Sequence, residues 1–204
     1  YMKSQAPELR VIYYDSMTSE GKMDWQNALT DKNSMFLSDE EGNAVADEMF
    51  LNFWWTEDEL ASEELIKASA KKAEELGLDP YQVFAGVDIQ ADGYMTPIRW
   101  DLFESSDNST HTSLGLYCPN WAYTSAQNLD DFHKKENNLW VNSKQDPSAD
   151  IEYASDTQWH GVSTYAVEKS AITSLPFVTN FNTGSGYSFF KNGEQISTLD
   201  WNNR

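Results

Sequence analysis

The sequence has a single cysteine, few basic residues and no long apolar run. Cys118 is the only cysteine among 204 residues, so no disulfide can form within the chain. Lysine and arginine number 14 against 33 acidic residues, which gives a formal net charge of −19. Such a surface repels nucleic acid and anionic lipid, and no stretch has the length and apolar content of a membrane span. We therefore expect neither a nucleic-acid partner nor membrane insertion.

Histidine is also scarce, and phosphate-binding motifs are missing. His111, His133 and His160 are far apart in the sequence, and none has the spacing of a metal site. Gly184-Ser185-Gly186 is too short for a phosphate-binding loop and lacks the lysine of a P-loop. The sequence predicts no metal and no cofactor.

Aromatic residues, in contrast, are abundant. The chain holds 8 tryptophans, 10 tyrosines and 10 phenylalanines, more than a core of this size needs, so we expect some of them in an open cleft. Aromatic rings stack on the apolar face of a pyranose, and carboxylates accept hydrogen bonds from its hydroxyl groups. A neutral, hydroxyl-rich ligand fits this acidic, aromatic composition.

Strand and helix patterns alternate along most of the chain. Strands are predicted over 10–14, 48–55, 83–89 and 112–118, and helices over 24–34, 56–76 and 128–140. Thr56 and Glu59 have the spacing of a capping box for the second helix, and Gly77 is a natural stop. The alternation predicts an α/β fold with parallel strands.

The four strand–helix units amount to about half of a (β/α)8 barrel. We expect residues 1–170 to form the second half of such a TIM-type barrel, strands 5–8, in a chain that starts within a longer protein. Residues 171–204 are different in character. They contain strand patterns over 176–184 and 187–190 and a hairpin turn at Asn192-Gly193, and we expect a β-rich segment leading into an accessory domain.

Aromatic or acidic residues recur at the end of each predicted strand. In a parallel barrel these ends form one rim, where the chemistry lies. Any one of them could be an ordinary core residue, and only the recurrence favours a site. Asp15 and Asp88 could also be a pair of carboxylates that cleave a glycosidic bond, as in other barrel glycosidases. The rim residues are Tyr14, Trp25, Phe53, Trp54, Asp88 and Tyr117.

The sequence contains an ordered set of motifs, namely Tyr13-Tyr14-Asp15-Ser16 with Trp25-Gln26, then 52–55 (NFWW), 84–88 (FAGVD), 114–117 (LGLY) and 181–184 (FNTG). Together they resemble the endo-β-N-acetylglucosaminidases of glycoside hydrolase family 85. The resemblance implies a (β/α)8 barrel followed by β-rich domains. It also implies cleavage of the chitobiose core of N-linked glycans with retention of configuration, in which the substrate's acetamido oxygen attacks the anomeric carbon.

The resemblance further implies a glutamate acid/base and, two residues before it, an asparagine that orients the acetamido group. This pair belongs to the strand before the Tyr13-Tyr14 strand, so we expect it upstream of residue 1, in the N-terminal half of the barrel. The only Asn-x-Glu of the chain, Asn192-Gly193-Glu194, lies in the predicted hairpin. Without that partner half, the chain alone is expected to be inactive.

By the same resemblance, Tyr14 is the expected catalytic residue, which would hydrogen-bond the reacting acetamido group. The expected substrate-binding residues are Asp15, Trp25, Asn52, Phe53, Trp54, Asp88 and Tyr117, with the aromatic members as walls of the cleft. A glycoprotein substrate implies a secreted or cell-surface enzyme. The alternative function is that of a non-catalytic carbohydrate-binding protein with an aromatic cleft.

Overall fold

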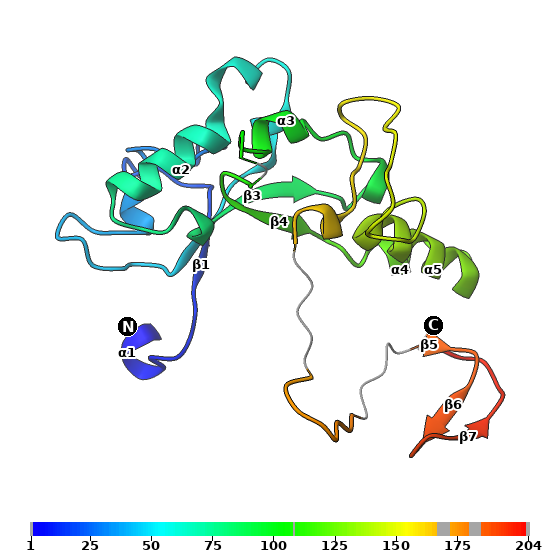
Figure 1. Ribbon diagram of the computed structural model, residues 1–204. Helices are drawn as coiled ribbons and strands as arrows, with labels where there is room; N and C mark the ends of the chain where they lie inside the picture. Colours follow the sequence, from blue (N-terminus) through cyan, green and yellow to red (C-terminus); the bar gives the residue numbers. More distant parts are fainter. Residues whose placement is uncertain (1, 108, 167–171, 180–184, 203–204) are drawn as a thin grey trace.

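A four-stranded parallel sheet organises the protein. The computed structural model describes residues 2–107, 109–166, 172–179 and 185–202. The strands follow one another in sequence order, β1-β2-β3-β4, and every neighbouring pair is parallel (Figure 1). Their bounds are β1 Ile12–Tyr14, β2 Glu48–Phe50, β3 Val83–Asp88 and β4 Ser113–Tyr117. The four predicted strands are confirmed, although β2 ends at Phe50, because a 3-10 turn at Phe53–Thr56 follows it.

The strand register separates the two faces of the sheet. Tyr14 pairs with Phe50, Phe50 with Phe84, and Asp88 with Tyr117. Paired residues on parallel strands point to the same face, and neighbours along a strand point to opposite faces. One face therefore carries Tyr14, Phe50, Asp88 and Tyr117, whereas the other carries the buried apolar residues of the strands.

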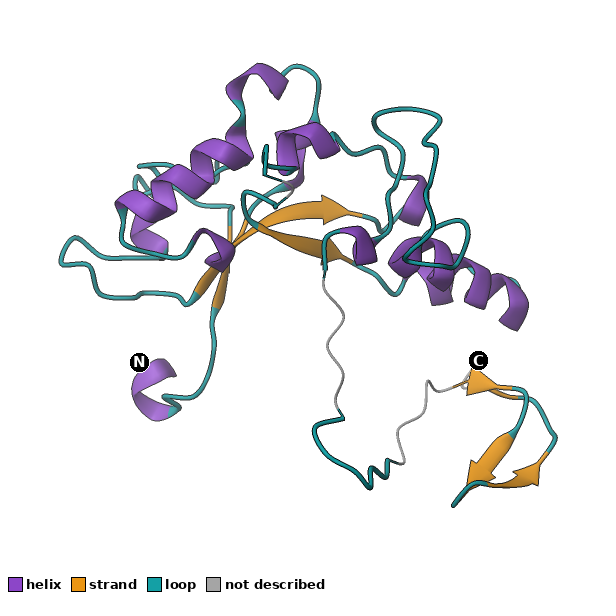
Figure 2. Ribbon diagram, viewed as in Figure 1, coloured by secondary structure: helices purple, strands orange, loops and turns teal. Residues whose placement is uncertain are grey.

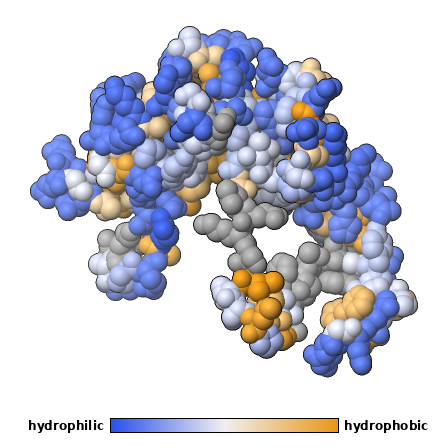
Figure 3. Space-filling model, in the orientation of Figure 1, coloured by the Kyte–Doolittle hydropathy of each residue, from blue (hydrophilic) through white to orange (hydrophobic). Residues whose placement is uncertain are grey.

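Helices cover the apolar face. Helix α2 (Leu65–Glu75) runs across it, and the short helix α3 (Trp100–Phe103) lies beside α2 (Figure 2). The charged side of α2 faces outward, and the surface over it is mostly hydrophilic in Figure 3. Fully buried side chains between the layers are Met49, Leu51, Ile66, Ala73, Val83, Ala85, Val87, Ile89, Trp100 and Phe103.

The remaining elements are short. The helices are α1 Met2–Gln5, α4 Trp121–Thr124 and α5 Leu129–Glu136, with a π-helix at Asn137–Val141 after α5. Turns of 3-10 helix lie at Ser34–Phe36, Ala61–Glu63, Pro80–Gln82, Gly93–Met95 and Val162–Thr164. The predicted helix over 128–140 is thus confirmed, with Asn128 as its N-cap. No helix in the part of the chain that the structure describes has the length and apolar content needed to cross a bilayer.

Two helix predictions need correction. Residues 24–33 form an irregular loop rather than a helix, because their backbone N–H groups turn towards the buried carboxylate of Asp15. Helix α2 begins at Leu65, not after Thr56: the Thr56 hydroxyl accepts a hydrogen bond from the Arg99 backbone N–H (2.6 Å) and caps nothing. Gly77 follows the helix with a left-handed φ of 72°, as predicted.

The C-terminal segment forms antiparallel pairs. Strands β6 (Phe189–Lys191) and β7 (Glu194–Ser197) form the predicted hairpin, with Asn192 and Gly193 both at positive φ. Strand β5 (Ser185–Gly186) pairs with β8 (Trp201–Asn202). Of the strand predicted over 176–184, residues 176–179 form none, and 180–184 lie outside the described residues.

Candidate active site

Aromatic rings from three strand ends meet on the face of the sheet opposite the helices. Tyr14 ends β1, Phe53 follows β2, and Tyr117 ends β4. The Phe53 ring lies between the other two, with its centroid 6.3 Å from that of Tyr14 and 5.6 Å from that of Tyr117. Tyr14 and Tyr117 are 40% and 46% exposed. The structure therefore brings these predicted rim residues together with their rings open to a ligand.

Phe50 forms the floor beneath these rings. Its ring contacts those of Tyr14 and Phe53 at centroid distances of 6.2 Å each. Phe50 also lies over two strand glycines: a Cβ at Gly115 would come within 2.4 Å of its Cε2, and a Cβ at Gly86 within 2.6 Å of its Cε1 and 2.0 Å of the Leu51 carbonyl oxygen. Only glycine leaves room there for the ring and, at Gly86, for the backbone of the neighbouring strand.

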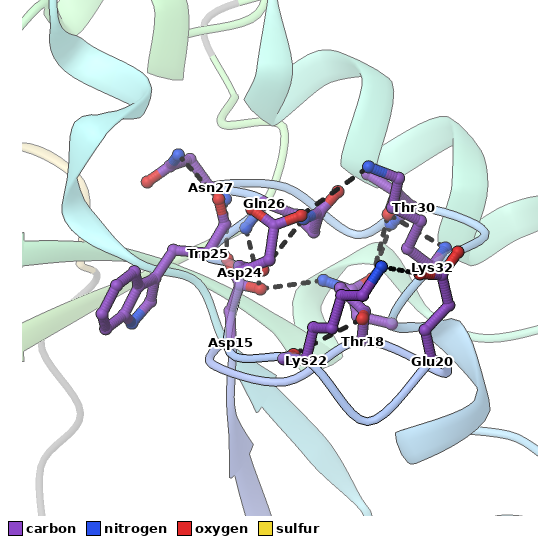
Figure 4. A network of polar contacts seen from close by, with 11 residues as sticks. Asp15, Thr18, Glu20, Lys22, Asp24, Trp25, Gln26, Asn27, Thr30 and Lys32 are labelled. Carbon is purple, nitrogen blue, oxygen red and sulfur yellow. Dashed lines mark hydrogen bonds and ion pairs between the residues drawn. The ribbon is translucent and has the colours of Figure 1, made fainter.

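Trp25 and Trp54 form a second aromatic group beside the first. Their rings meet edge to face with centroids 5.8 Å apart, and Trp54 is about half exposed. Trp25 comes from the loop after β1, and its indole points away from the polar network of that loop in Figure 4. Burial has the larger effect and raises the pKa of Tyr14, whereas a hydrogen bond from the Trp25 side chain lowers it. The two tryptophans thus adjoin the Tyr14 end of the rim.

Asp15 has a different place from the one expected. It follows Tyr14 directly, so its side chain points to the helix-covered face, where it is fully buried. Its Oδ2 accepts the Asn27 N–H (2.7 Å), and its Oδ1 accepts the Gln26 N–H (3.2 Å) and the Asn33 Nδ2–H (2.9 Å) (Figure 4). Burial raises the pKa of Asp15, although these hydrogen bonds oppose the rise. A carboxylate enclosed in this way organises the loop, and direct contact with a substrate does not fit its position.

Asn52 connects the loop to the rim. Its Oδ1 accepts a 2.6 Å hydrogen bond from the Tyr14 hydroxyl, and its Nδ2 donates a 2.8 Å bond to Asn27 Oδ1. The same Asn27 oxygen accepts the Trp54 backbone N–H at 3.2 Å. Asn52 is itself buried. The Tyr14 hydroxyl is therefore held by a buried amide rather than by solvent.

The electrostatic setting keeps Tyr14 protonated. Its pKa is raised, first by burial and then by the charge of Asp15, with further contributions from Tyr117 and Asp88. Asp88 is exposed at the end of β3, and its Oδ1 accepts the Gln90 N–H at 2.9 Å. The rim thus presents two tyrosine hydroxyls, of Tyr14 and Tyr117, and the exposed side chain of Asp88. Among the described side chains, no group of three or more His, Cys, Asp or Glu residues is arranged to hold a metal ion.

Three contributors to the site were not predicted from the sequence: Asn27, Phe50 and the glycine pair Gly86 and Gly115. The glycines carried a signal, because glycine inside a strand often marks a close approach. Phe50 carried only the signal of an aromatic residue within the predicted strand over 48–55, since the register that places it under the rim is known from the structure. Asn27 carried no local signal, since its role depends on contacts 12 and 25 residues away in sequence.

Comparison with known proteins decides the family. A family-wide sequence model described as glycosyl hydrolase family 85 matches residues 1–189, most of the chain. The chain belongs to glycosyl hydrolase family 85. The resemblance inferred from its motifs is thereby confirmed.

Relatives agree with this assignment. The chain is 29% identical over 204 residues to cytosolic endo-beta-N-acetylglucosaminidase 1 of Arabidopsis thaliana, covering 99% of this chain and 25% of that protein. The corresponding zebrafish (Danio rerio) enzyme is 27% identical over 208 residues, with coverages of 99% and 24%. The chain thus spans about a quarter of the length of these curated relatives.

A solved structure supports the fold. The glycoside hydrolase domain of Endo-D from Streptococcus pneumoniae R6 superposes with a TM-score of 0.80 at 26% identity, covering 99% of this chain and 31% of that one. The fold is therefore the TIM-barrel-like α/β fold of the family, as predicted. The expected secreted or cell-surface location is wrong, because the matching plant, zebrafish and human enzymes are all named cytosolic.

Proposed function

We propose that the protein containing this chain is an endo-β-N-acetylglucosaminidase that cleaves the chitobiose core of N-linked glycans. The observation that carries this proposal is the gathering of Tyr14, Phe53 and Tyr117 at one end of a parallel sheet, in a chain of family 85. Relatives named for this activity match nearly all of the chain. The open rings suit the apolar faces of sugars, and Asp88 offers a carboxylate to their hydroxyl groups.

In this proposal the chain supplies substrate-binding residues and Tyr14, but not the acid/base. Residues 1–170 would form the second half of the barrel, and residues 171–204 would lead into an accessory domain. Tyr14 would hydrogen-bond the acetamido group whose oxygen attacks the anomeric carbon, which holds that oxygen in line for attack. Phe53, Trp54 and Trp25 would be walls of the cleft, and Asp88 and Tyr117 would lie along its rim. Asn52 would act through Tyr14, because its Oδ1 accepts a 2.6 Å hydrogen bond from the Tyr14 hydroxyl.

The acid/base glutamate and its neighbouring asparagine would come from an N-terminal half of the barrel. Two observations support this. Asp15, one candidate acid within the chain, is buried and receives three hydrogen bonds of 3.2 Å or less. Glu194, in the only Asn-x-Glu of the chain, lies at the start of β7 in the C-terminal hairpin.

The test is release of labelled glycan from a high-mannose glycopeptide, with the mass of the remaining peptide as the second readout. The intact protein should leave one N-acetylglucosamine on the peptide, and this chain should do so only when its N-terminal half is added. Binding of the glycan with no cleavage by the intact protein would favour a carbohydrate-binding protein instead. Cleavage by this chain alone would contradict the upstream acid, and Asp88→Asn would then show whether Asp88 has that role.

A further inference from the structure

Each amide in the hydrogen-bonded series from Trp54 through Asn27 and Asn52 to Tyr14 has one defined orientation. A backbone N–H can only donate, so the Trp54 N–H requires an acceptor, and the atom of Asn27 that faces it must be Oδ1. That oxygen also faces Asn52, which must then present its Nδ2 to Asn27. The amide oxygen of Asn52 is left for the Tyr14 hydroxyl. The orientation of each amide therefore follows from a single backbone donor.

Asn27 is suited to this place by its backbone as well as its side chain. Its φ is 56°, in the left-handed region that asparagine tolerates better than most residues. Its N–H is held by Asp15 Oδ2 at 2.7 Å, and its side chain is almost wholly buried. Asp15 and Tyr14 point to opposite faces of β1. Asn27 connects the two faces, because its backbone N–H is bound by Asp15 and its side-chain oxygen by Asn52 at the rim.

We propose that Asn27 is a positioning residue for Tyr14: its side-chain oxygen fixes the orientation of the Asn52 amide, which in turn holds the Tyr14 hydroxyl in place. Asn27 itself does not touch the ligand. The proposal rests on the proposed function insofar as Tyr14 contacts the substrate, but the hydrogen bonds that carry it are independent of any activity.

Three variants of the intact protein test this. Asn27→Gly keeps the left-handed backbone and removes the oxygen that Asn52 and Trp54 share. Asn27→Asp keeps that oxygen and replaces the amide NH2, which donates a marginal 3.4 Å hydrogen bond to the Trp25 carbonyl, with a second carboxylate oxygen that adds a negative charge near Asp15. The matched control is Asn192→Gly, the same substitution at another left-handed asparagine (φ 52°), exposed in the β6–β7 turn.

The first readout is the kinetics of glycan release. For Asn27→Gly we expect kcat to fall roughly tenfold to a hundredfold with little change in KM, because a misplaced Tyr14 impairs the reaction more than binding. Asn27→Asp should recover most of the lost kcat, and Asn192→Gly should match the wild type. A loss of kcat in Asn192→Gly equal to that in Asn27→Gly would overturn the proposal, since the effect would then not depend on the oxygen that Asn52 and Trp54 share.

The second readout needs no activity: titration of the Tyr14 phenol by NMR of tyrosine-labelled protein, assigned with Tyr14→Phe. Once Asn52 is free to turn, it no longer holds the hydroxyl as an acceptor. The pKa of Tyr14 should then fall in Asn27→Gly by about half a unit to one unit, the equivalent of one ordinary hydrogen bond. It should stay at or above the wild-type value in Asn27→Asp.

The two readouts separate the possible failures. An intact protein that releases no glycan would contradict the proposed function, and the titration would still decide the role of Asn27. A Tyr14 titration that is the same in Asn27→Gly and the wild type would overturn the positioning role, whatever happens to kcat.

Discussion

The Tyr14 hydroxyl donates a 2.6 Å hydrogen bond to Asn52 Oδ1, which joins the ends of β1 and β2 at the rim of the site. Behind this bond lie Asn27 and the buried Asp15, which order the loop between the two strands. The Tyr14 hydroxyl is thus held by buried side chains, although the residue as a whole is 40% exposed. A fixed hydroxyl can orient a reacting group without losing side-chain entropy when the ligand binds.

Trp54 tests the role of the aromatic walls. We expect Trp54→Ala to raise KM for a glycopeptide roughly tenfold, which corresponds to about 1.4 kcal/mol of lost binding, with kcat less affected. Trp140→Ala is the matched control, because Trp140 is also substantially exposed but lies in the π-helix after α5. Equal effects of the two substitutions on KM would count against a wall at Trp54.

A substitution at Asp15 tests whether its carboxylate has a structural role in the loop or acts as a catalytic acid. Asparagine there would turn an NH2 group towards at least one of the N–H donors that now surround the carboxylate. We expect Asp15→Asn to lower the free energy of unfolding by about 1–3 kcal/mol, measured by chemical denaturation. Asp88→Asn, at an exposed carboxylate, should change it little. A fully stable Asp15→Asn variant would contradict the structural role.

Gly115 tests the floor of the site. A methyl group there would meet Phe50 Cε2 at 2.4 Å and Phe84 Cβ at 3.1 Å. We expect Gly115→Ala to destabilise the protein by about 1–3 kcal/mol through overpacking. Combining it with Phe50→Ala should cost less than the sum of the two single changes, because the clash is with that ring. Additive effects would show that the ring and the glycine are independent.

His160 provides a prediction of pH dependence. Burial lowers its pKa, although Glu104, with an oxygen 3.7 Å from Nδ1, opposes the shift. The ring also stacks on Tyr153 and Trp100 and bonds Tyr165 through Nδ1.

The unfolded chain therefore takes up this proton at a higher pH than the folded chain does. The free energy of unfolding should fall as pH decreases from about 6.5, the ordinary histidine value, towards the lower folded pKa. Denaturation curves between about pH 7.5 and pH 5, chosen to bracket the ordinary histidine pKa of about 6.5, should show this slope. His160→Gln should reduce it, and an unchanged slope in the variant would contradict the assignment.

The strands and the rim were predictable because they depend on local patterns. The four strands are short apolar runs, and parallel pairing by itself brings Tyr14, Phe53 and Tyr117 to one end of the sheet. The conformation of the loop over 16–33 was not predictable, because it depends on hydrogen bonds from backbone N–H groups to Asp15, which lies 11 and 12 residues earlier in the sequence. The amphipathic pattern of this loop is typical of a helix, but the tertiary hydrogen bonds to the Asp15 carboxylate outweigh that local preference.

The helix start was missed for a similar reason. Thr56 and Glu59 have the right spacing for a cap, but the Thr56 hydroxyl is engaged by the Arg99 backbone from a segment 43 residues further on. The location was missed because it was inferred from the substrate class rather than from any residue.

The most direct test of the account is the rate of glycan release by two phenylalanine variants of the intact protein. Tyr14 and Tyr13 are neighbours on β1 that point to opposite faces, and the Tyr13 ring stacks on Phe36 at 4.5 Å, away from the rim. Each substitution removes one hydroxyl. We expect Tyr14→Phe to reduce kcat by roughly a hundredfold or more and Tyr13→Phe to leave it near the wild-type value. A Tyr14→Phe variant as active as Tyr13→Phe would contradict the placement of the reacting acetamido group at Tyr14.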